Sequence, residues 1–244
     1  MLAVILAGGK GTRLKPYTTV FPKALAPLGE MPVLEWVLRQ LKAAGFDEII
    51  LSVGHLAHLI ETYFGDGASL GLKITYAREE TPLGTAGPLR AIADLPEQFL
   101  VMNADILCDL DYRAFFEAHC ASGALATVSA YRRDSRIDFG ILHFDGAGSS
   151  PQAGRIQGFE EKPTLHHWVS MGVYAFRRDI CAFIPDDRPF GFDDLMHALI
   201  AAQADARAIP FDGYWLDIGR VDDYDQAMAD VQTQRDRLLP GGMA

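Results

Sequence analysis

The chain has 244 residues, with 22 basic and 32 acidic residues, a formal net charge of −10 and 49% hydrophobic residues. A chain of this length and apolar content can bury a large core, which excludes a disordered protein, a collagen-like fibre and a disulfide-stapled miniprotein. The acidic balance argues against nucleic acid or a membrane surface as a partner.

The cysteines and the N-terminus indicate a compartment. Cys108, Cys120 and Cys181 form no C-x-x-C pair, which predicts a reduced cytoplasmic protein with three packed thiols. No stretch approaches the roughly 18 apolar residues that span a bilayer. The apolar run at 2–7 follows no basic segment and is too short for a signal peptide, so we expect a buried first strand there.

Short β-type runs alternate with helical patterns as far as about residue 120. Strands are predicted at 2–6, 48–53, 72–76 and 99–102, and helices at 32–44, 55–64 and 86–93. The first of these strands is continuously aliphatic, as in a central parallel strand that is buried on both faces. The alternation predicts an α/β fold with a doubly wound, mostly parallel, Rossmann-like sheet between helices, in which residues 1–120 form a nucleotide-binding half.

The pattern changes after residue 120. Strands are predicted at 124–131, 140–144, 155–159 and 168–176, and helices at 192–202 and 221–235. This β-rich stretch predicts a small antiparallel extension beside the parallel sheet, which would form the second wall of a cleft. Because no internal repeat or low-complexity linker is visible, we expect a single domain over 1–244, with its second half at about 121–235.

The charge is unevenly distributed. The first 29 residues contain no acidic residue and four basic ones, Lys10, Arg13, Lys15 and Lys23. Such a segment in an acidic protein suggests a small anionic ligand, although solvated surface lysines would give the same pattern.

A glycine-rich loop follows the first strand. Gly8, Gly9 and Gly11 lack a Cβ, so backbone N–H groups in this loop can approach and wrap an anion. A dinucleotide fingerprint fails because Leu14 stands where its third glycine is needed, and the spacing of a Walker A loop is absent. The loop therefore supports neither NAD nor a P-loop NTPase.

The segment LAGGKGTRLKPYT at 6–18, followed by FPKALAPLG at 21–29, resembles the signature of the sugar-1-phosphate nucleotidylyltransferases, also called NDP-sugar pyrophosphorylases. Five more motifs of this family follow in the family's order: TPLGTAGPL at 81–89, MNADI at 102–106, FEEKP at 159–163, SMGVYAF at 170–176 and YWLDIG at 214–219. The pattern is most similar to the mannose-1-phosphate and heptose-1-phosphate guanylyltransferases. The resemblance implies an enzyme that uses Mg²⁺ and transfers a nucleotidyl group from an NTP, preferably GTP, to a sugar 1-phosphate, with release of pyrophosphate.

The resemblance also implies roles for residues on the nucleotide side. Arg13 would contact the β- and γ-phosphates, and Lys23 would neutralise the α-phosphate. The remaining nucleotide-binding residues would be Leu6, Ala7, Gly8, Gly9, Gly11, Thr12, Pro82, Gly84, Thr85, Gly87 and Asn103. The segment 81–89 would read the base, with Thr85 as a hydrogen-bonding group; an ordinary turn before a helix is the alternative.

On the metal and sugar side, the resemblance implies that Asp105 and Asp217 hold Mg²⁺, for which two carboxylates and phosphate oxygens suffice. The sugar-phosphate-binding residues would be Gly140, Glu161, Lys162, Ser170 and Gly172, with the Glu161 carboxylate on sugar hydroxyls and the Lys162 ammonium on the phosphate. The chain departs from the family pattern at Ala104, where glycine is usual, and at Ser170, where many relatives have asparagine.

Other polar residues favour structural roles. His55 and His58 are interpreted as helix-surface residues, and Asp109 and Asp111 as turn and N-cap residues. Two other functions stay open: a glucose-1-phosphate thymidylyl- or uridylyltransferase, and a non-catalytic regulatory paralogue that binds an NDP-sugar. The hexapeptide-repeat β-helix of some relatives is not expected in this chain, and self-association as a homo-oligomer through apolar helix faces is left open.

Overall fold

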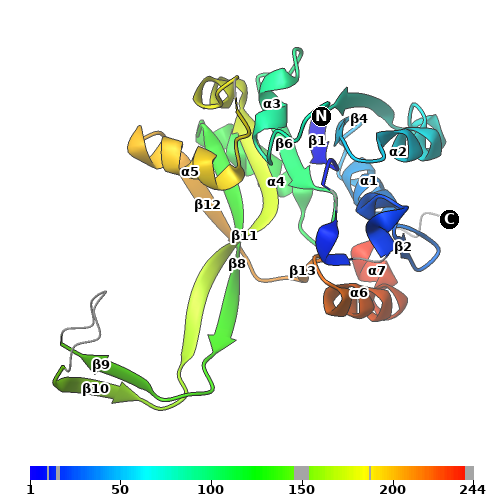
Figure 1. Ribbon diagram of the computed structural model, residues 1–244. Helices are drawn as coiled ribbons and strands as arrows, with labels where there is room; N and C mark the ends of the chain where they lie inside the picture. The colour runs from blue at the N-terminus through cyan, green and yellow to red at the C-terminus, as the bar shows by residue number, and fades with distance from the viewer. Residues whose placement is uncertain (10, 15–16, 146–153, 187, 240–244) are drawn as a thin grey trace.

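The computed structural model describes residues 1–9, 11–14, 17–145, 154–186 and 188–239. Its centre is a seven-stranded sheet with helices on both faces (Figure 1). In spatial order the strands are β12 (Ala206–Phe211), β8 (Ala126–Arg136), β11 (Thr164–Arg177), β6 (Gln98–Asn103), β1 (Leu2–Leu6), β4 (Glu48–Val53) and β5 (Lys73–Arg78). Smaller sheets pair β9 (Ile141–Phe144) with β10 (Ile156–Glu160), β7 (Ile106–Cys108) with β13 (Trp215–Asp217), and β2 (Pro27–Leu28) with β3 (Met31–Pro32).

The α-helices are α1 (Val33–Ala43), α2 (Ala57–Phe64), α3 (Gly87–Ala91), α4 (Tyr112–Ser122), α5 (Phe192–Ala201), α6 (Val221–Thr233) and α7 (Arg235–Leu238). Short 3-10 helices are η1 (Thr12–Leu14), η2 (Tyr17–Thr19), η3 (Lys23–Leu25), η4 (Ala68–Leu70) and η5 (Arg178–Phe183). None of the helices in the described part of the chain has the length and apolar character needed to cross a bilayer.

The central strand β1 shows why the sheet is covered on both faces. It pairs in parallel with β4 on one side and β6 on the other. Ile5 packs into a core with α1, α2 and α4, whereas Val4 packs into a second core with α3 and α5 on the opposite face. A strand that is buried on both faces needs a continuous aliphatic sequence, as β1 has. The prediction of a doubly wound, mostly parallel sheet is confirmed.

The structure adds two elements that were not predicted and corrects two expectations. The helix α4 was not predicted, although the Asp111 carboxylate accepts a hydrogen bond from Ala114 N at 2.9 Å and is the N-cap expected of it. Strand β12 was also missed. The antiparallel strand β11 lies inside the main sheet, between β6 and β8, and not beside it. Finally, Cys120 is exposed, so only Cys108 and Cys181 fit the prediction of packed thiols.

Strands β8 and β11 continue beyond the sheet as a two-stranded ribbon, and β9 and β10 pair with each other at its far end (Figure 1). We call residues 131–145 and 154–170 the arm. None of these described residues is buried, in contrast to the inner halves of β8 and β11. The arm therefore has no core of its own.

Candidate active site

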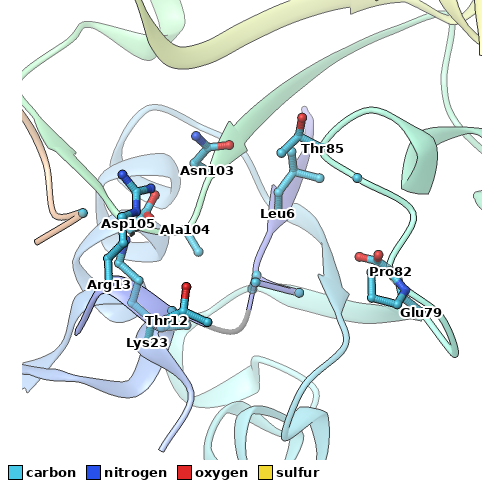
Figure 2. A pocket seen from close by; sticks show the side chains of 17 residues that line it. Leu6, Thr12, Arg13, Lys23, Glu79, Pro82, Thr85, Asn103, Ala104 and Asp105 are labelled. Atoms are coloured by element: carbon cyan, nitrogen blue, oxygen red, sulfur yellow. Dashed lines mark hydrogen bonds and ion pairs between the residues drawn. The ribbon is translucent and has the colours of Figure 1, made fainter. Parts of the chain in front are cut away.

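A pocket of about 410 Å³ opens at the carboxyl ends of β1 and β6, where α/β sheets commonly bind ligands. The predicted site residues that line it are Leu6, Ala7, Gly8, Gly9, Gly11, Thr12, Arg13, Lys23, Pro82, Gly84, Thr85, Asn103 and Asp105. Ala24, Glu79, Ala104 and Gly219 complete the lining. Figure 2 shows Arg13, Lys23 and Asp105 together on one side, with Glu79 and Pro82 on the other.

The glycine loop has little room for side chains. A Cβ on Gly8 would lie 2.6 Å from Glu79 Oε1. Gly11 has a φ of +58°, and its carbonyl accepts a hydrogen bond of 2.7 Å from the Thr18 hydroxyl. Glycine at Gly8 leaves room for the Glu79 carboxylate, and the positive φ at Gly11 favours glycine there. The predicted basic residues Lys10 and Lys15 lie outside the described residues.

Charged side chains from distant parts of the sequence meet at one end of the pocket. Lys23 Nζ forms an ion pair with Asp105 Oδ2, and both side chains are partly buried. A Cβ on Gly219 would lie 3.5 Å from Asp217 Oδ1 and 3.6 Å from Arg13 Nη1, so these two groups flank Gly219. The structure therefore brings Arg13, Lys23, Asp105 and Asp217 to one place.

Backbone pairing positions Asp217 beside Asp105. Strand β13 pairs antiparallel with β7, which sets Asp217 opposite Ile106, and Ile218 N donates to Asp105 O at 3.0 Å. Burial raises the pKa of Asp217, and the neighbouring Asp105 carboxylate raises it further, while Lys23 and Arg13 lower it. Two neighbouring carboxylates form an oxygen-rich place for a cation.

The opposite end of the pocket is formed by the loop after β5. Glu79 accepts hydrogen bonds from Ser52 Oγ at 2.8 Å and from Leu83 N at 3.1 Å, which fix the loop against β4. Glu79 was not predicted as a site residue. Its place at the carboxyl end of a parallel strand is the signal that could have revealed it.

The backbone at Phe190, in the second half of the chain, also holds this loop through hydrogen bonds. Phe190 O accepts hydrogen bonds from Ala86 N and Gly87 N, both at 3.0 Å. Gly84 has a φ of +84°, and a Cβ there would lie 2.5 Å from Phe190 O. Thr85 lines the pocket, and its Oγ1 accepts a hydrogen bond from Phe192 N at 2.8 Å. Gly87 is buried at the start of α3, so it is the one predicted nucleotide-binding residue outside the pocket lining.

The predicted sugar-phosphate residues fall into two groups. Gly172 has a φ of +77°, and a Cβ there would lie 2.8 Å from Asn103 Nδ2, so Gly172 adjoins the pocket. Ser170, two residues away on β11, donates to the Tyr174 hydroxyl at 3.1 Å.

Gly140, Glu161 and Lys162 form the second group and lie on the arm, outside the pocket lining. A Cβ on Gly140 would lie 3.3 Å from Glu161 Oε2, so these residues are close to one another. Their binding of the sugar phosphate stays a prediction.

The histidines form no second site. His55 and His58 are exposed, in line with the interpretation as surface residues. Among the residues that the structure describes, no three His, Cys, Asp or Glu side chains are placed to hold a metal ion. A metal at Asp105 and Asp217 would therefore need oxygen atoms from the substrate.

Comparisons with known proteins show what the chain is similar to along most of its length. The chain is 34% identical to a UTP–glucose-1-phosphate uridylyltransferase of Synechocystis, over 99% of this chain and 66% of the relative. It is 32% identical to a mannose-1-phosphate guanylyltransferase of Mycobacterium tuberculosis, over 94% of this chain and 64% of the relative. The chain thus spans slightly less than two thirds of these curated relatives.

The solved structure of HddC from Yersinia pseudotuberculosis, complexed with GMP-PN, superposes with a TM-score of 0.71 at 26% identity, over 94% of this chain and 98% of that chain. The family described as "Nucleotidyl transferase" matches residues 2–234, which is nearly the whole chain. With the glycine loop, the charged cluster and the doubly wound sheet, these matches lead to one conclusion: the chain belongs to the nucleotidyl transferase family.

Proposed function

We propose that the protein is a Mg²⁺-dependent sugar-1-phosphate nucleotidylyltransferase that joins GTP and mannose 1-phosphate, or a related sugar 1-phosphate, to give an NDP-sugar and pyrophosphate. The observation that carries this proposal is the meeting of Arg13, Lys23, Asp105 and Asp217 beside the glycine loop. A reaction between two phosphate anions needs such a concentration of charged groups.

In the proposed reaction, an oxygen of the sugar phosphate attacks the α-phosphorus of the nucleotide. A new P–O bond forms, the bond to the bridging oxygen breaks, and its electron pair leaves with the pyrophosphate. The barrier comes from charge repulsion and misorientation, so catalysis depends on positioning and on cationic groups. Arg13 would bind the departing β- and γ-phosphates, and Lys23 would bind the α-phosphate.

The donor set at Asp105 and Asp217 fits Mg²⁺, which prefers one or two carboxylates together with phosphate oxygens. These two residues would hold the ion, which when bound adds positive charge between the repelling phosphates. Burial and then the neighbouring Asp105 carboxylate raise the pKa of Asp217, and a cation held by the two side chains would favour the charged form of Asp217.

The relatives support two different nucleotides as the substrate. GTP is supported by the mannose-1-phosphate guanylyltransferase relatives and by the GMP-PN complex of HddC. A second candidate, transfer from UTP or dTTP to glucose 1-phosphate, is supported by the uridylyltransferase relative at 34% identity.

Pyrophosphate release tests the proposal. The protein is mixed with Mg²⁺, each of GTP, ATP, CTP, UTP and dTTP, and either mannose 1-phosphate or glucose 1-phosphate. We expect the highest rate with GTP and mannose 1-phosphate. A rate confined to UTP or dTTP with glucose 1-phosphate selects the second candidate. Binding of an NDP-sugar without turnover of any pair would instead identify a regulatory paralogue.

A further inference from the structure

A short ladder of two strands, β7 and β13, joins the two carboxylates of the site to a third carboxylate, that of Asp109. Asp105 lies directly before β7, and Asp109 lies directly after it. Asp217 ends β13, and Tyr214 lies directly before that strand. At a rise of about 3.3 Å per residue, Asp109 is about 13 Å along the strand from Asp105. Asp109 is therefore outside the pocket lining, but it belongs to the ladder that carries both proposed metal ligands.

Hydrogen bonds outside the three residue pairs of the ladder close both of its ends. At the pocket end, Ile218 N donates to Asp105 O at 3.0 Å. At the other end, Asp109 N donates to Tyr214 O at 3.2 Å, and Tyr214 N donates to Asp109 Oδ1 at 2.7 Å. The Asp109 carboxylate thus accepts the bond that a backbone carbonyl would accept in a longer ladder. Because a two-stranded sheet is marginally stable alone, this side chain helps to fix the register of the two strands.

The C-terminal helices α6 and α7 hold this end of the ladder. Arg237 on α7 forms an ion pair from its Nε with Asp109 Oδ2, and the Asp109 side chain is only 17% exposed. The Tyr214 hydroxyl donates at 2.6 Å to Asp230 Oδ2 on α6. Asp230 is buried and also accepts from Gln226 Nε2 at 2.9 Å. Each strand of the ladder is therefore tied to one of the two helices at the end that is farther from the pocket.

A buried glutamine on α1 adds a further connection. Gln40 Nε2 donates to Cys108 O at 2.7 Å and to Leu238 O at 2.8 Å, so both hydrogens of this amide nitrogen are used. Cys108 ends β7, and Leu238 ends α7. One side chain therefore joins α1, the ladder and the C-terminal helix beside Asp109, which makes this end of the ladder a firm support.

We propose that Asp109 is a positioning residue for the metal site. Held by Arg237, it fixes the register of the β7–β13 ladder and thereby the separation of the carboxylates of Asp105 and Asp217. This separation matters because Mg²⁺ demands short bonds in a nearly ideal octahedral arrangement, and residues that orient metal ligands change metal affinity. The inference rests on the proposed function, in which these two carboxylates hold Mg²⁺.

Metal binding without turnover tests this role. Mn²⁺ replaces Mg²⁺ and is titrated into the protein with the nucleotide that gives the highest rate of pyrophosphate release, in the absence of a sugar phosphate. The relaxation rate of water protons reports the Mn²⁺ that is bound to the protein. Asp109→Asn keeps the shape of the side chain and removes its ion pair with Arg237, so the Kd for Mn²⁺ should rise about tenfold. Arg237→Ala breaks the same pair and should have the same effect.

Two further variants separate positioning from a general loss of stability. The matched control Asp205→Asn breaks an ion pair with Arg207 at the outer strand β12 and should leave the Kd for Mn²⁺ unchanged. The second variant adds Asp109→Asn to Asp217→Asn. Because a proposed ligand is already lost there, the ladder no longer has a carboxylate pair to position, and the second change should not weaken Mn²⁺ binding further.

The outcomes distinguish this inference from the proposed function. An unchanged Kd for Mn²⁺ in Asp109→Asn overturns the positioning role, as does an equal rise in Asp205→Asn or a further rise in the Asp217→Asn background. If Asp109→Asn does not fold, Arg237→Ala decides by the same criteria, because it breaks the same ion pair from the more exposed side. In all these cases a wild type that turns over a substrate pair retains the proposed function. A wild type that turns over no pair overturns the proposed function and this inference with it.

Discussion

Gly8 and Gly9 are neighbours in the glycine loop, but alanine should affect them differently. A Cβ on Gly8 would lie 2.6 Å from Glu79 Oε1, whereas a Cβ on Gly9 would have no heavy atom within 4 Å. Neither glycine has a positive φ, so the backbone at both positions accepts alanine. Gly8→Ala must therefore displace the Glu79 carboxylate, and Gly9→Ala displaces nothing.

The cost follows from the hydrogen bonds that hold Glu79. Its carboxylate accepts from Ser52 Oγ at 2.8 Å and from Leu83 N at 3.1 Å. A hydrogen bond to a charged group contributes about 1.5–3 kcal/mol, so the loss of one of the two should lower the free energy of unfolding by about 2 kcal/mol. For a chain of this length, that corresponds to a fall in Tm of about 4–8 °C.

Thermal denaturation of the two variants measures this difference, with Gly9→Ala as the matched control. Because Leu83 would shift with Glu79, Gly8→Ala should also raise the KM for the nucleotide about tenfold. In a Glu79→Ala background the contact is gone, so Gly8→Ala should then cost almost nothing. Equal Tm values for the two alanine variants, or a cost that persists without Glu79, would refute the reasoning.

Three more predictions concern the charged and buried polar groups. Lys23→Ala should reduce kcat about 100- to 1000-fold because it removes a preorganised cation. The control Lys73→Ala breaks an exposed ion pair and should not reduce kcat in this way. A loss below threefold in Lys23→Ala would contradict the role of Lys23. Asp217→Asn should raise the Mg²⁺ concentration needed for half-maximal activity at least tenfold, as measured by metal titration, and an unchanged requirement would exclude Asp217 as a ligand. Burial lowers the pKa of His119 below its ordinary value of 6.5, so the unfolded chain binds this proton more tightly than the folded chain does. The contribution of His119 to the free energy of unfolding should therefore be fully present above about pH 6.5 and should be lost as the pH decreases. Urea unfolding from pH 5 to pH 8 should show this slope, and His119→Asn should flatten it.

The nucleotide side of the pocket was predictable because its residues are local in sequence. The loop from Leu6 to Arg13 follows a strand whose burial is evident from its aliphatic run, and glycine is needed where φ is positive or a neighbour is close, as at Gly11. Asp105 was predictable in the same way, because it follows the buried apolar strand β6. Strand ends and glycine positions are properties of short segments, and a sequence displays them directly.

The elements and site residues that were not predicted depend on contacts between distant segments. Phe190 holds the loop at 83–87 through its backbone, so no side-chain pattern marks it. The helix α4 carries aromatic residues, Phe115 and Phe116, whose place against the sheet decides the fold more than their weak helix propensity does. Glu79 acts through hydrogen bonds with residues 27 positions before it and four after it, which a motif search does not connect.

The arm shows a different limit of sequence prediction. The alternation of Leu142 and Phe144 with polar residues predicts a half-buried strand, and the strand is present with its apolar face exposed. Periodicity indicates that one face must be covered but not which chain supplies the cover. The same residues would give the same pattern in a monomer whose arm packs on its own body. Where the arm points is set instead by the pairing of β8 with β11, whose register shifts between Ser170 and Tyr174, and no periodicity within one strand reveals such a shift.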